Sequence, residues 1–294
     1  MFKTIEDYLH ALKSEMNDAD PALVQDALAD AREHLTLAVE AAKEKQPDGD
    51  PSEVLNRIMD EYGTPEETAN AYREVERRTS PALKPTVKSR SIFAKFFGVY
   101  ADSRAWGALL YMLIAFVTGV FYFTWAVTGL SLSISFAIFI FGLPFALLFL
   151  LSVRGLALLE GRLVEALLGI RMPRRPLFSH QGMKWLDRLK ALLTDKATWL
   201  MLVYMIIQFV LGILYFVVMV TWIALSLSFM ALPFIQLVWK IPVIVFGDQP
   251  RILPMWELIL FSISGFLSLT VFVHVAKGVG QLHGKLAKWM LVSE

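Results

Sequence analysis

The stretch that decides the fold is AWGALLYMLIAFVTGVFYFTWAVTGLSLSISFAIFIFGLPFALLFLLSV, residues 105–153, which has no Asp, Glu, Lys or Arg in 49 positions. Two further charge-free stretches follow, of 43 residues at 197–239 and of 19 residues at 258–276. Because a membrane-spanning helix needs about 20 apolar residues, the first stretch holds two spans joined by a tight turn at 128–131. The sequence therefore predicts four spanning helices, over 106–128, 133–153, 199–222 and 257–276.

Residues 223–256 are the ambiguous part of this pattern. Four prolines interrupt the segment, Pro233, Pro242, Pro250 and Pro254, and prolines at this density break helices. A five-span alternative makes 223–246 a helix and places the basic C-terminal tail outside. Lys and Arg concentrate on the cytoplasmic side of membrane proteins, and the 154–196 loop carries nine of them: Arg154, Arg162, Arg171, Arg174, Arg175, Lys184, Arg188, Lys190 and Lys196. Four spans with both termini in the cytoplasm fit these positions better.

Charge divides the chain into two regions. Residues 1–83 contain nine Lys/Arg and nineteen Asp/Glu, a net charge of −10, whereas the remaining 211 residues carry +11. We therefore expect a cytoplasmic helical domain at 1–80, a basic linker at 81–100 and a transmembrane domain at 101–294. The absence of cysteine suits a reducing compartment, and the acidic start lacks the features of a signal peptide. The expected location is the bacterial inner membrane, with several passes and both termini in the cytoplasm.

The membrane region repeats itself at an offset of 93 residues. Asp102-Ser-Arg-Ala-Trp106 recurs as Asp195-Lys-Ala-Thr-Trp199, and the same offset pairs Tyr111 with Tyr204, Met112 with Met205, Phe116 with Phe209 and Gly119 with Gly212. A second match, at an offset of 123, relates 154–163 to 277–286. Both copies enter the membrane from the same side, which predicts two parallel repeats in an all-α, four-helix membrane domain. Gly119, Gly212, Tyr111 and Tyr204 are its candidate packing positions, because mid-span glycines let helices approach closely.

Residues 1–80 predict four short helices. Asp20-Pro21, Asp50-Pro51 and Thr64-Pro65 each combine a capping side chain with proline at the first helical position, and Gly63 fits a helix C-terminus. Apolar residues at helical spacing give the first two helices a buried face: Leu9, Leu12 and Met16, then Val24, Leu28, Ala31, Leu35 and Val39.

Two segments resemble known families. Asp30-Ala-Arg-Glu-His34 and Glu61-Tyr-Gly-Thr-Pro-Glu-Glu-Thr-Ala69 resemble the HAAS signalling domain of bacterial membrane proteins, over residues 1–78. The resemblance makes Asp30, Arg32, His34, Gly63 and Pro65 a candidate signalling motif, in which Asp30 and His34, one turn apart, can pair.

Residues 100–293 resemble the sensor domain that precedes the kinase in many actinobacterial two-component sensors. The Asp-x-x-x-Trp repeats and Leu167-Leu-Gly-Ile170 carry this resemblance. No dimerisation helix, phospho-accepting histidine or ATPase domain follows in this sequence, so we do not expect kinase activity.

Catalytic patterns are missing from the sequence. The five histidines, His10, His34, His180, His274 and His283, have no metal-ligand spacing, and there is neither a phosphate loop nor a nucleophile elbow. The stretches 105–153, 197–239 and 258–276 contain no Asp, Glu, Lys or Arg, which disfavours ion-coupled transport. We expect no enzymatic activity, no cofactor and no metal.

The sequence thus predicts a membrane sensor or regulator that relays an envelope or lipophilic signal to a cytoplasmic protein partner. The alternative is a component of a small-molecule or lipid transporter. The proline-interrupted 223–256 segment breaks the repeat symmetry, so the candidate ligand region is the one that contains Trp239, Phe246 and Trp256.

Two partners are open for the basic segments at 154–168 and 277–290. They suit anionic lipid headgroups, or else the acidic N-terminal domain docks on them. No direct nucleic-acid binding is expected, and homo-oligomerisation is left open.

Overall fold

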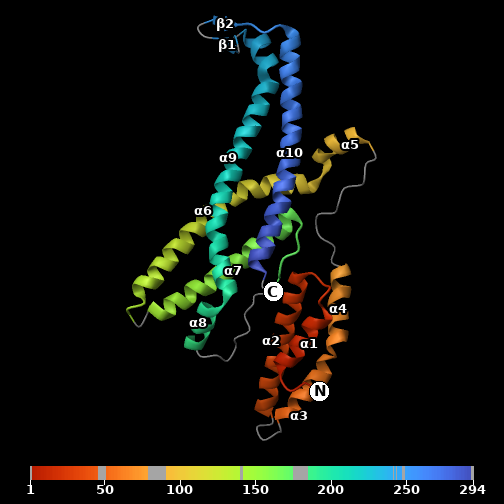
Figure 1. The fold of residues 1–294 in the computed structure, drawn as a ribbon, viewed down its shortest axis with the longest axis vertical. Coiled ribbons are helices and arrows are strands. Elements are labelled where there is room, and N and C mark those ends of the chain that lie inside the picture. The colour runs from red at the N-terminus through yellow and green to blue at the C-terminus, as the bar shows by residue number, and fades with distance from the viewer. Residues whose placement is uncertain are drawn as a thin grey trace. The chain divides into compact units, whose positions relative to one another are not determined.

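The computed structural model describes residues 2–45, 51–78, 91–139, 142–174, 185–240, 242, 244–246 and 249–292. Figure 1 shows the path of the chain. Its helices are α1 (Ile5–Glu15), α2 (Pro21–Lys45), α3 (Pro51–Tyr62), α4 (Pro65–Arg78), α5 (Ile92–Phe97), η1 (Gly98–Ala101), α6 (Ser103–Phe136), α7 (Gly142–Leu168), α8 (Trp185–Thr194), α9 (Lys196–Trp239) and α10 (Met255–Leu291). The described part of the chain is all-α apart from a hairpin of two short strands, β1 (Ile244–Phe246) and β2 (Gln249–Arg251).

The first four helices share one hydrophobic core. It is built from Tyr8, Leu9, Leu12, Met16, Leu23, Ala27, Ala31, Leu35, Ile58, Met59 and Ala69, all buried. The Tyr8 hydroxyl donates to the Gly63 carbonyl at 2.9 Å and lies 3.0 Å from the Thr68 hydroxyl, which ties α1 to the start of α4. Burial raises the pKa of the Tyr8 phenol.

Helix starts in this region follow the capping rules. Thr4 and Asp7 form a reciprocal capping box at α1, and Asp20 Oδ1 accepts from the Ala22 backbone N–H at 2.9 Å at α2. The cap predicted for α3, Asp50, lies outside the described residues.

In the part of the chain that the structure describes, four helices are long and apolar enough to cross a membrane: α6, α7, α9 and α10. This confirms the predicted number, but their ends differ from the prediction. The turn expected at 128–131 is helical, and α6 continues to Phe136. In a bilayer a helix is the cheapest way to satisfy backbone polar groups, so Gly129 and its polar neighbours do not end it.

The segment after the third span is also more helical than expected. α9 continues through Pro233 to Trp239, so 223–239 extends the helix rather than forming an outer loop. A proline removes only one backbone donor, and such a loss is tolerated in long apolar helices. The Gln236 side chain then closes the connection, because Nε2 donates to the Leu253 carbonyl at 2.7 Å and Oε1 accepts from the Leu253 N–H at 2.9 Å.

Part of the expected linker is ordered as helix. Residues 79–90 lie outside the described residues, and 92–101 form α5 and η1. His274 of α10 fastens α5, since its Nε2 donates to the Phe96 carbonyl at 2.9 Å and the two rings stack.

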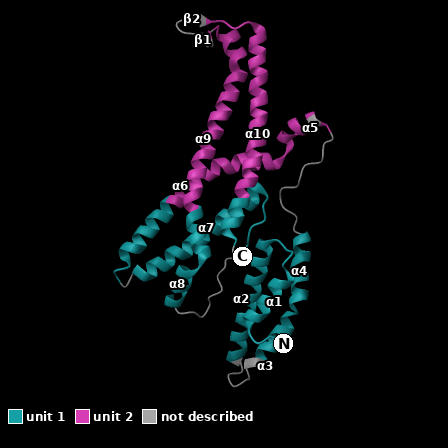
Figure 2. Cartoon of the chain, in the orientation of Figure 1, with its two compact units in different colours: residues 1–82, 124–204, 285–294 teal, residues 83–123, 205–284 magenta. Residues whose placement is uncertain are grey.

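Figure 2 shows two compact units. The first contains residues 1–82, 124–204 and 285–294, and the second contains 83–123 and 205–284. α6, α9 and α10 each contribute to both units.

Candidate functional site

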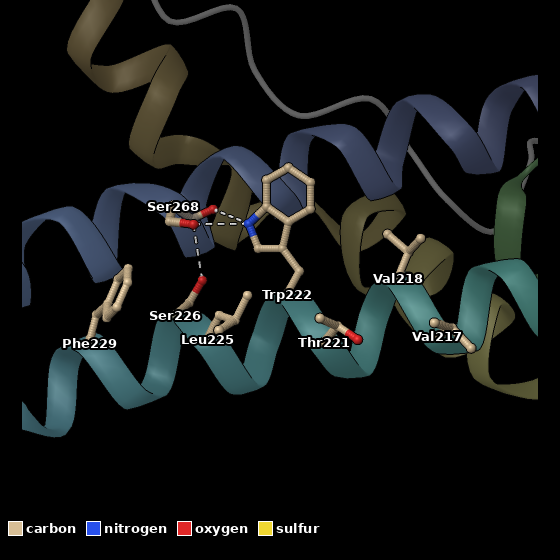
Figure 3. A pocket seen from close by; sticks show the side chains of 8 residues that line it. All are labelled: Val217, Val218, Thr221, Trp222, Leu225, Ser226, Phe229 and Ser268. Atoms are coloured by element: carbon tan, nitrogen blue, oxygen red, sulfur yellow. Dashed lines mark hydrogen bonds between the residues drawn. The ribbon is translucent and has the colours of Figure 1, made fainter. Parts of the chain in front are cut away.

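A pocket of about 430 Å³ lies between α9 and α10 in the second unit. Figure 3 shows the residues that line it: Val217, Val218, Thr221, Trp222, Leu225, Ser226 and Phe229 from α9, and Ser268 from α10. Its volume falls in the range of about 300–1,000 Å³ that is usual for small-molecule sites. None of these eight residues is ionisable, so the lining holds no general base or metal ligand.

Three polar residues of the pocket wall, Trp222, Ser226 and Ser268, bond to one another. The Trp222 indole N–H lies 3.0 Å from the Ser268 hydroxyl and 3.2 Å from the Ser268 carbonyl, and the Ser226 hydroxyl donates to Ser268 at 3.2 Å. Figure 3 shows Trp222 reaching across toward α10. The surface left for an occupant is mostly hydrocarbon, which suits an apolar ligand.

A glycine sets how closely the two helices approach beside the pocket. A Cβ on Gly265 would lie 2.6 Å from the Ser226 carbonyl oxygen and 2.9 Å from Phe229 Cβ. One helical turn away, the Trp222 ring stacks on Phe272, with centroids 5.5 Å apart. Gly265 lets α9 and α10 approach closely, whereas the large ring of Trp222 keeps them further apart. The pocket lies beside these two positions.

The predicted ligand region is not where this pocket lies. Trp239 and Trp256 are 60% and 65% exposed, and the side chain of Phe246, in β1, lies outside the described part of the chain. Sequence reasoning missed the pocket because its lining comes from two helices, and Ser268 lies 39 to 51 positions after the lining residues of α9. The sequence feature that could have indicated the pocket was the presence of Trp222, Ser226 and Ser268 within otherwise apolar stretches.

The predicted packing glycines lie where α6 and α9 cross. A Cβ on Gly119 would come 2.7 Å from the Gln208 carbonyl oxygen, and one on Gly212 would come 3.0 Å from Phe116 Cα. The rings beside them pair at matched positions, Phe116 with Phe216 at 4.6 Å and Phe123 with Phe209 at 4.5 Å. These contacts lie within the second unit.

The predicted tyrosines bond to residues that also correspond between the repeats. The Tyr111 hydroxyl lies 2.6 Å from His283 Nε2 and accepts from Gln208 Nε2 at 3.2 Å. Tyr204 donates to Glu160 Oε1 at 3.1 Å. His283 stands 123 positions after Glu160, the second offset of the sequence match.

Two ion pairs follow the same correspondence. Asp102 accepts from Lys277 Nζ at 2.5 Å, and Asp195 accepts from the Arg154 guanidinium. Burial alone would raise the pKa of Asp102, but Lys277 and the Arg104 backbone N–H outweigh it, and the pKa lies below its usual value. The sequence analysis found both aspartates as matched positions of the repeat and did not identify their cations.

Three residues of the candidate signalling motif, Asp30, Arg32 and His34, contact the neighbouring N-terminal helices. Tyr72 of α4 donates to Asp30, Arg32 pairs with Glu6 at 2.6 Å, and the His34 ring lies 4.9 Å from that of Tyr62. These partners come from other helices rather than from within α2.

The Gly63–Glu67 part of the motif is a helix junction. Gly63 has φ +104°, which favours glycine. Pro65 begins α4, and Thr64 and Glu67 form a capping box in which the Thr64 N–H and hydroxyl each lie 2.9 Å from the Glu67 carboxylate. These bonds lower the pKa of Glu67.

A cluster of charges joins the first helices to the segment after α7. Asp26 of α2, whose side chain is 9% exposed, accepts from Arg171 Nη2 at 2.8 Å and from the Arg174 backbone N–H at 2.7 Å. Glu76 of α4 lies 3.2 Å from Arg171 Nε. Lys288 Nζ donates to Asp20 at 2.5 Å. All these residues belong to the first unit. The sequence analysis left docking of the acidic N-terminal domain on the basic segments open but did not identify these contacts.

No cluster of three or more potential metal ligands occurs among the described residues.

A comparison with protein families finds one match. The model of a family described as "Putative sensor" matches residues 111–291, which is more than half of the chain. It covers most of the segment whose resemblance to a sensor domain the sequence indicated and does not reach the first four helices. No curated protein and no solved structure matches the chain.

Proposed function

Because this chain belongs to that sensor family, we propose that it is a membrane sensor that detects an apolar molecule and relays its presence to a cytoplasmic protein partner. The observation that carries the proposal is the pocket between α9 and α10. It lies on two helices long and apolar enough to span a membrane, so a lipophilic molecule can reach it from the bilayer.

The chemistry of the pocket supports a receptor site over a transporter. Ion-coupled transporters place ionisable or convergent polar groups near mid-bilayer. Here Ser226, Ser268 and the Trp222 N–H bond to one another, and the lining has no charged group. A transported polar solute would find no binding partner in it.

The first four helices are the proposed output domain. They share a core of their own, and the sequence from Asp30 to Ala69 resembles a HAAS signalling domain. The buried Asp26–Arg171 ion pair supports a path by which a change after α7 reaches α2. A cytoplasmic regulatory protein that binds these helices would receive the signal.

We also propose that the membrane domain consists of two parallel repeats. Four kinds of contact recur at matched positions: the aspartate–cation pairs, the tyrosine bonds, the glycine crossings and the Trp106 and Trp199 indole bonds, which reach carbonyl groups six residues back at 2.8 and 2.9 Å. In each ion pair, the start of the first helix of one repeat bonds to the second helix of the other repeat: Asp102, before α6, bonds to Lys277 of α10, and Asp195, before α9, bonds to Arg154 of α7. The basic residues at 154–174 and 277–288 support termini on the cytoplasmic side of the inner membrane.

The pocket is tested with a photoreactive fatty acid that carries a diazirine on its chain. In reconstituted protein we expect labelling within 217–229, and we expect Ser268→Phe, which fills the pocket, to lower it several-fold. Ser264→Phe is the matched control, because Ser264 lies one turn away on α10 and is exposed. Equal labelling of the Ser268→Phe variant and the unmodified protein would remove the support for this site.

A further inference from the structure

The contact between the first helices and the segment 169–174 consists of complementary charge. The N-terminal side contributes the carboxylates of Asp20, Asp26 and Glu76, and the other side contributes the side chains of Arg171 and Lys288 and the backbone N–H of Arg174. The Arg171 side chain is 12% exposed and that of Asp26 is 9% exposed, so this pair is largely removed from water. Buried opposite charges that bond on several sides specify one geometry.

The segment itself is held in place independently of the N-terminal helices. Gly169, with φ +69°, turns the chain at the end of α7, and its N–H donates to the Glu165 carbonyl at 3.1 Å. Arg174 Nη2 donates to Glu165 Oε1 at 2.8 Å, which raises the pKa of the guanidinium. The Arg174 carbonyl accepts from Arg162 at 3.1 Å. The donors that meet Asp26 are therefore fixed by α7 and its own loop.

Asp26 occupies an arrangement suited to an oxyanion. One carboxylate oxygen accepts from a guanidinium and the other from a backbone N–H. Phosphate oxygens accept from the same two donor types, and Arg is the side chain best shaped for them. The charge-free part of α7 ends at Val153, and Arg162, Arg171 and Arg174 are among the basic residues that follow it; basic groups beyond the end of a span meet anionic headgroups.

We infer that the 171–174 segment is a binding surface for the phosphate groups of anionic phospholipids, and that Asp26 and Glu76 compete with those lipids for it. When the N-terminal helices dock, their carboxylates cover the basic groups. When anionic lipid takes the guanidinium groups, the N-terminal helices are released and α2 is exposed to a partner. The inference deepens the proposed relay, on which it rests, and does not depend on the pocket.

The test uses the full chain, which contains no cysteine. Asp20→Cys and Lys288→Cys provide a pair whose cross-linking by a short bis-maleimide reports docking, while the Asp26–Arg171 contact stays intact. In phosphatidylcholine vesicles we expect efficient cross-linking. Vesicles in which a third of the lipid is phosphatidylglycerol should lower the yield at least threefold. Soluble glycerol phosphate at matched ionic strength should leave it unchanged, which separates lipid headgroups from free phosphate.

Charge variants separate docking from competition. Asp26→Asn should lose cross-linking even in phosphatidylcholine, whereas Glu40→Arg, at an exposed position on the same helix, should keep it. Far-ultraviolet circular dichroism checks that both variants are folded. Wild-type yield for folded Asp26→Asn would overturn the docking contact, and an unchanged yield in phosphatidylglycerol would overturn the competition. Neither outcome bears on photolabelling of the pocket, so failure of this inference and failure of the pocket proposal are distinguishable.

Discussion

Alanine substitution at Gly119 tests how tightly α6 and α9 cross. The new Cβ would lie 2.7 Å from the Gln208 carbonyl oxygen, which is closer than Cβ atoms are found in proteins, and 3.0 Å from Phe209 Cα, which is tighter than most Cβ contacts. Both neighbours are backbone atoms, so the strain is relieved only by moving a helix and not by turning a side chain. Overpacking of this kind typically costs about 1–3 kcal/mol.

A second glycine isolates that cost. Alanine gains about 0.8–1.0 kcal/mol over glycine within a helix, and this gain applies equally at Gly278 of α10, where nothing lies within 4 Å of an added Cβ. We therefore expect Gly278→Ala to be neutral or stabilising. Gly119→Ala should be less stable than Gly278→Ala by about 1–3 kcal/mol, since the helix-propensity terms cancel.

Unfolding in mixed micelles, titrated with dodecyl sulphate and followed by tryptophan fluorescence, measures the difference. Gly212→Ala should behave like Gly119→Ala, because its Cβ would lie 3.0 Å from Phe116 Cα. Equal unfolding free energies for Gly119→Ala, Gly212→Ala and Gly278→Ala would refute the close crossing.

Three further predictions follow. The pKa of Asp102 is lowered in the folded protein, so its ion pair stabilises the folded state fully above the unfolded-state pKa of about 3.9, and this stabilisation is lost as the pH falls through the folded-state pKa. Asp102→Asn should therefore flatten the fall in unfolding free energy between about pH 5 and about pH 3. An unchanged slope would contradict this. Residues 1–80 should fold alone, and Thr64→Ala should destabilise that fragment by about 0.5–2 kcal/mol in urea; a random-coil spectrum for the parent fragment would count against it. Single cysteines at positions 80, 180 and 293 should react with maleimide from the cytoplasmic side and one at 248 from the other side; periplasmic labelling at 293 would exclude four spans.

The number of long helices was predictable, but where they end was not. Length without charge is a property of the sequence, so the composition of residues 105–153 is enough to predict two spans. The ends depend on what surrounds the backbone. Thr128-Gly129-Leu130-Ser131 is a turn signal in water, yet inside an apolar helix it stays helical, and Pro233 likewise fails to end α9.

The contacts at the sites were predictable only in part. The offset of 93 residues identified Gly119 and Gly212 as equivalent, because identity at matched positions is visible in one sequence. The partners of Asp30 and His34 were not, since Tyr72 and Tyr62 come from other helices. The pocket beside Trp222 depends on packing between two helices, which no local pattern encodes.

The two ion pairs between the repeats, Asp102–Lys277 and Asp195–Arg154, determine the order in which the membrane helices can pair during synthesis. Lys277 follows Asp102 by 175 positions, whereas Arg154 precedes Asp195 by 41. At a synthesis rate of about 5–20 residues per second, Asp102 is synthesised roughly 9–35 s before its cation. Asp195 emerges with its cation already made. α6 therefore waits in the membrane before Asp102 can pair with Lys277, and the ion pair at the start of α6 forms only once α10 has been synthesised.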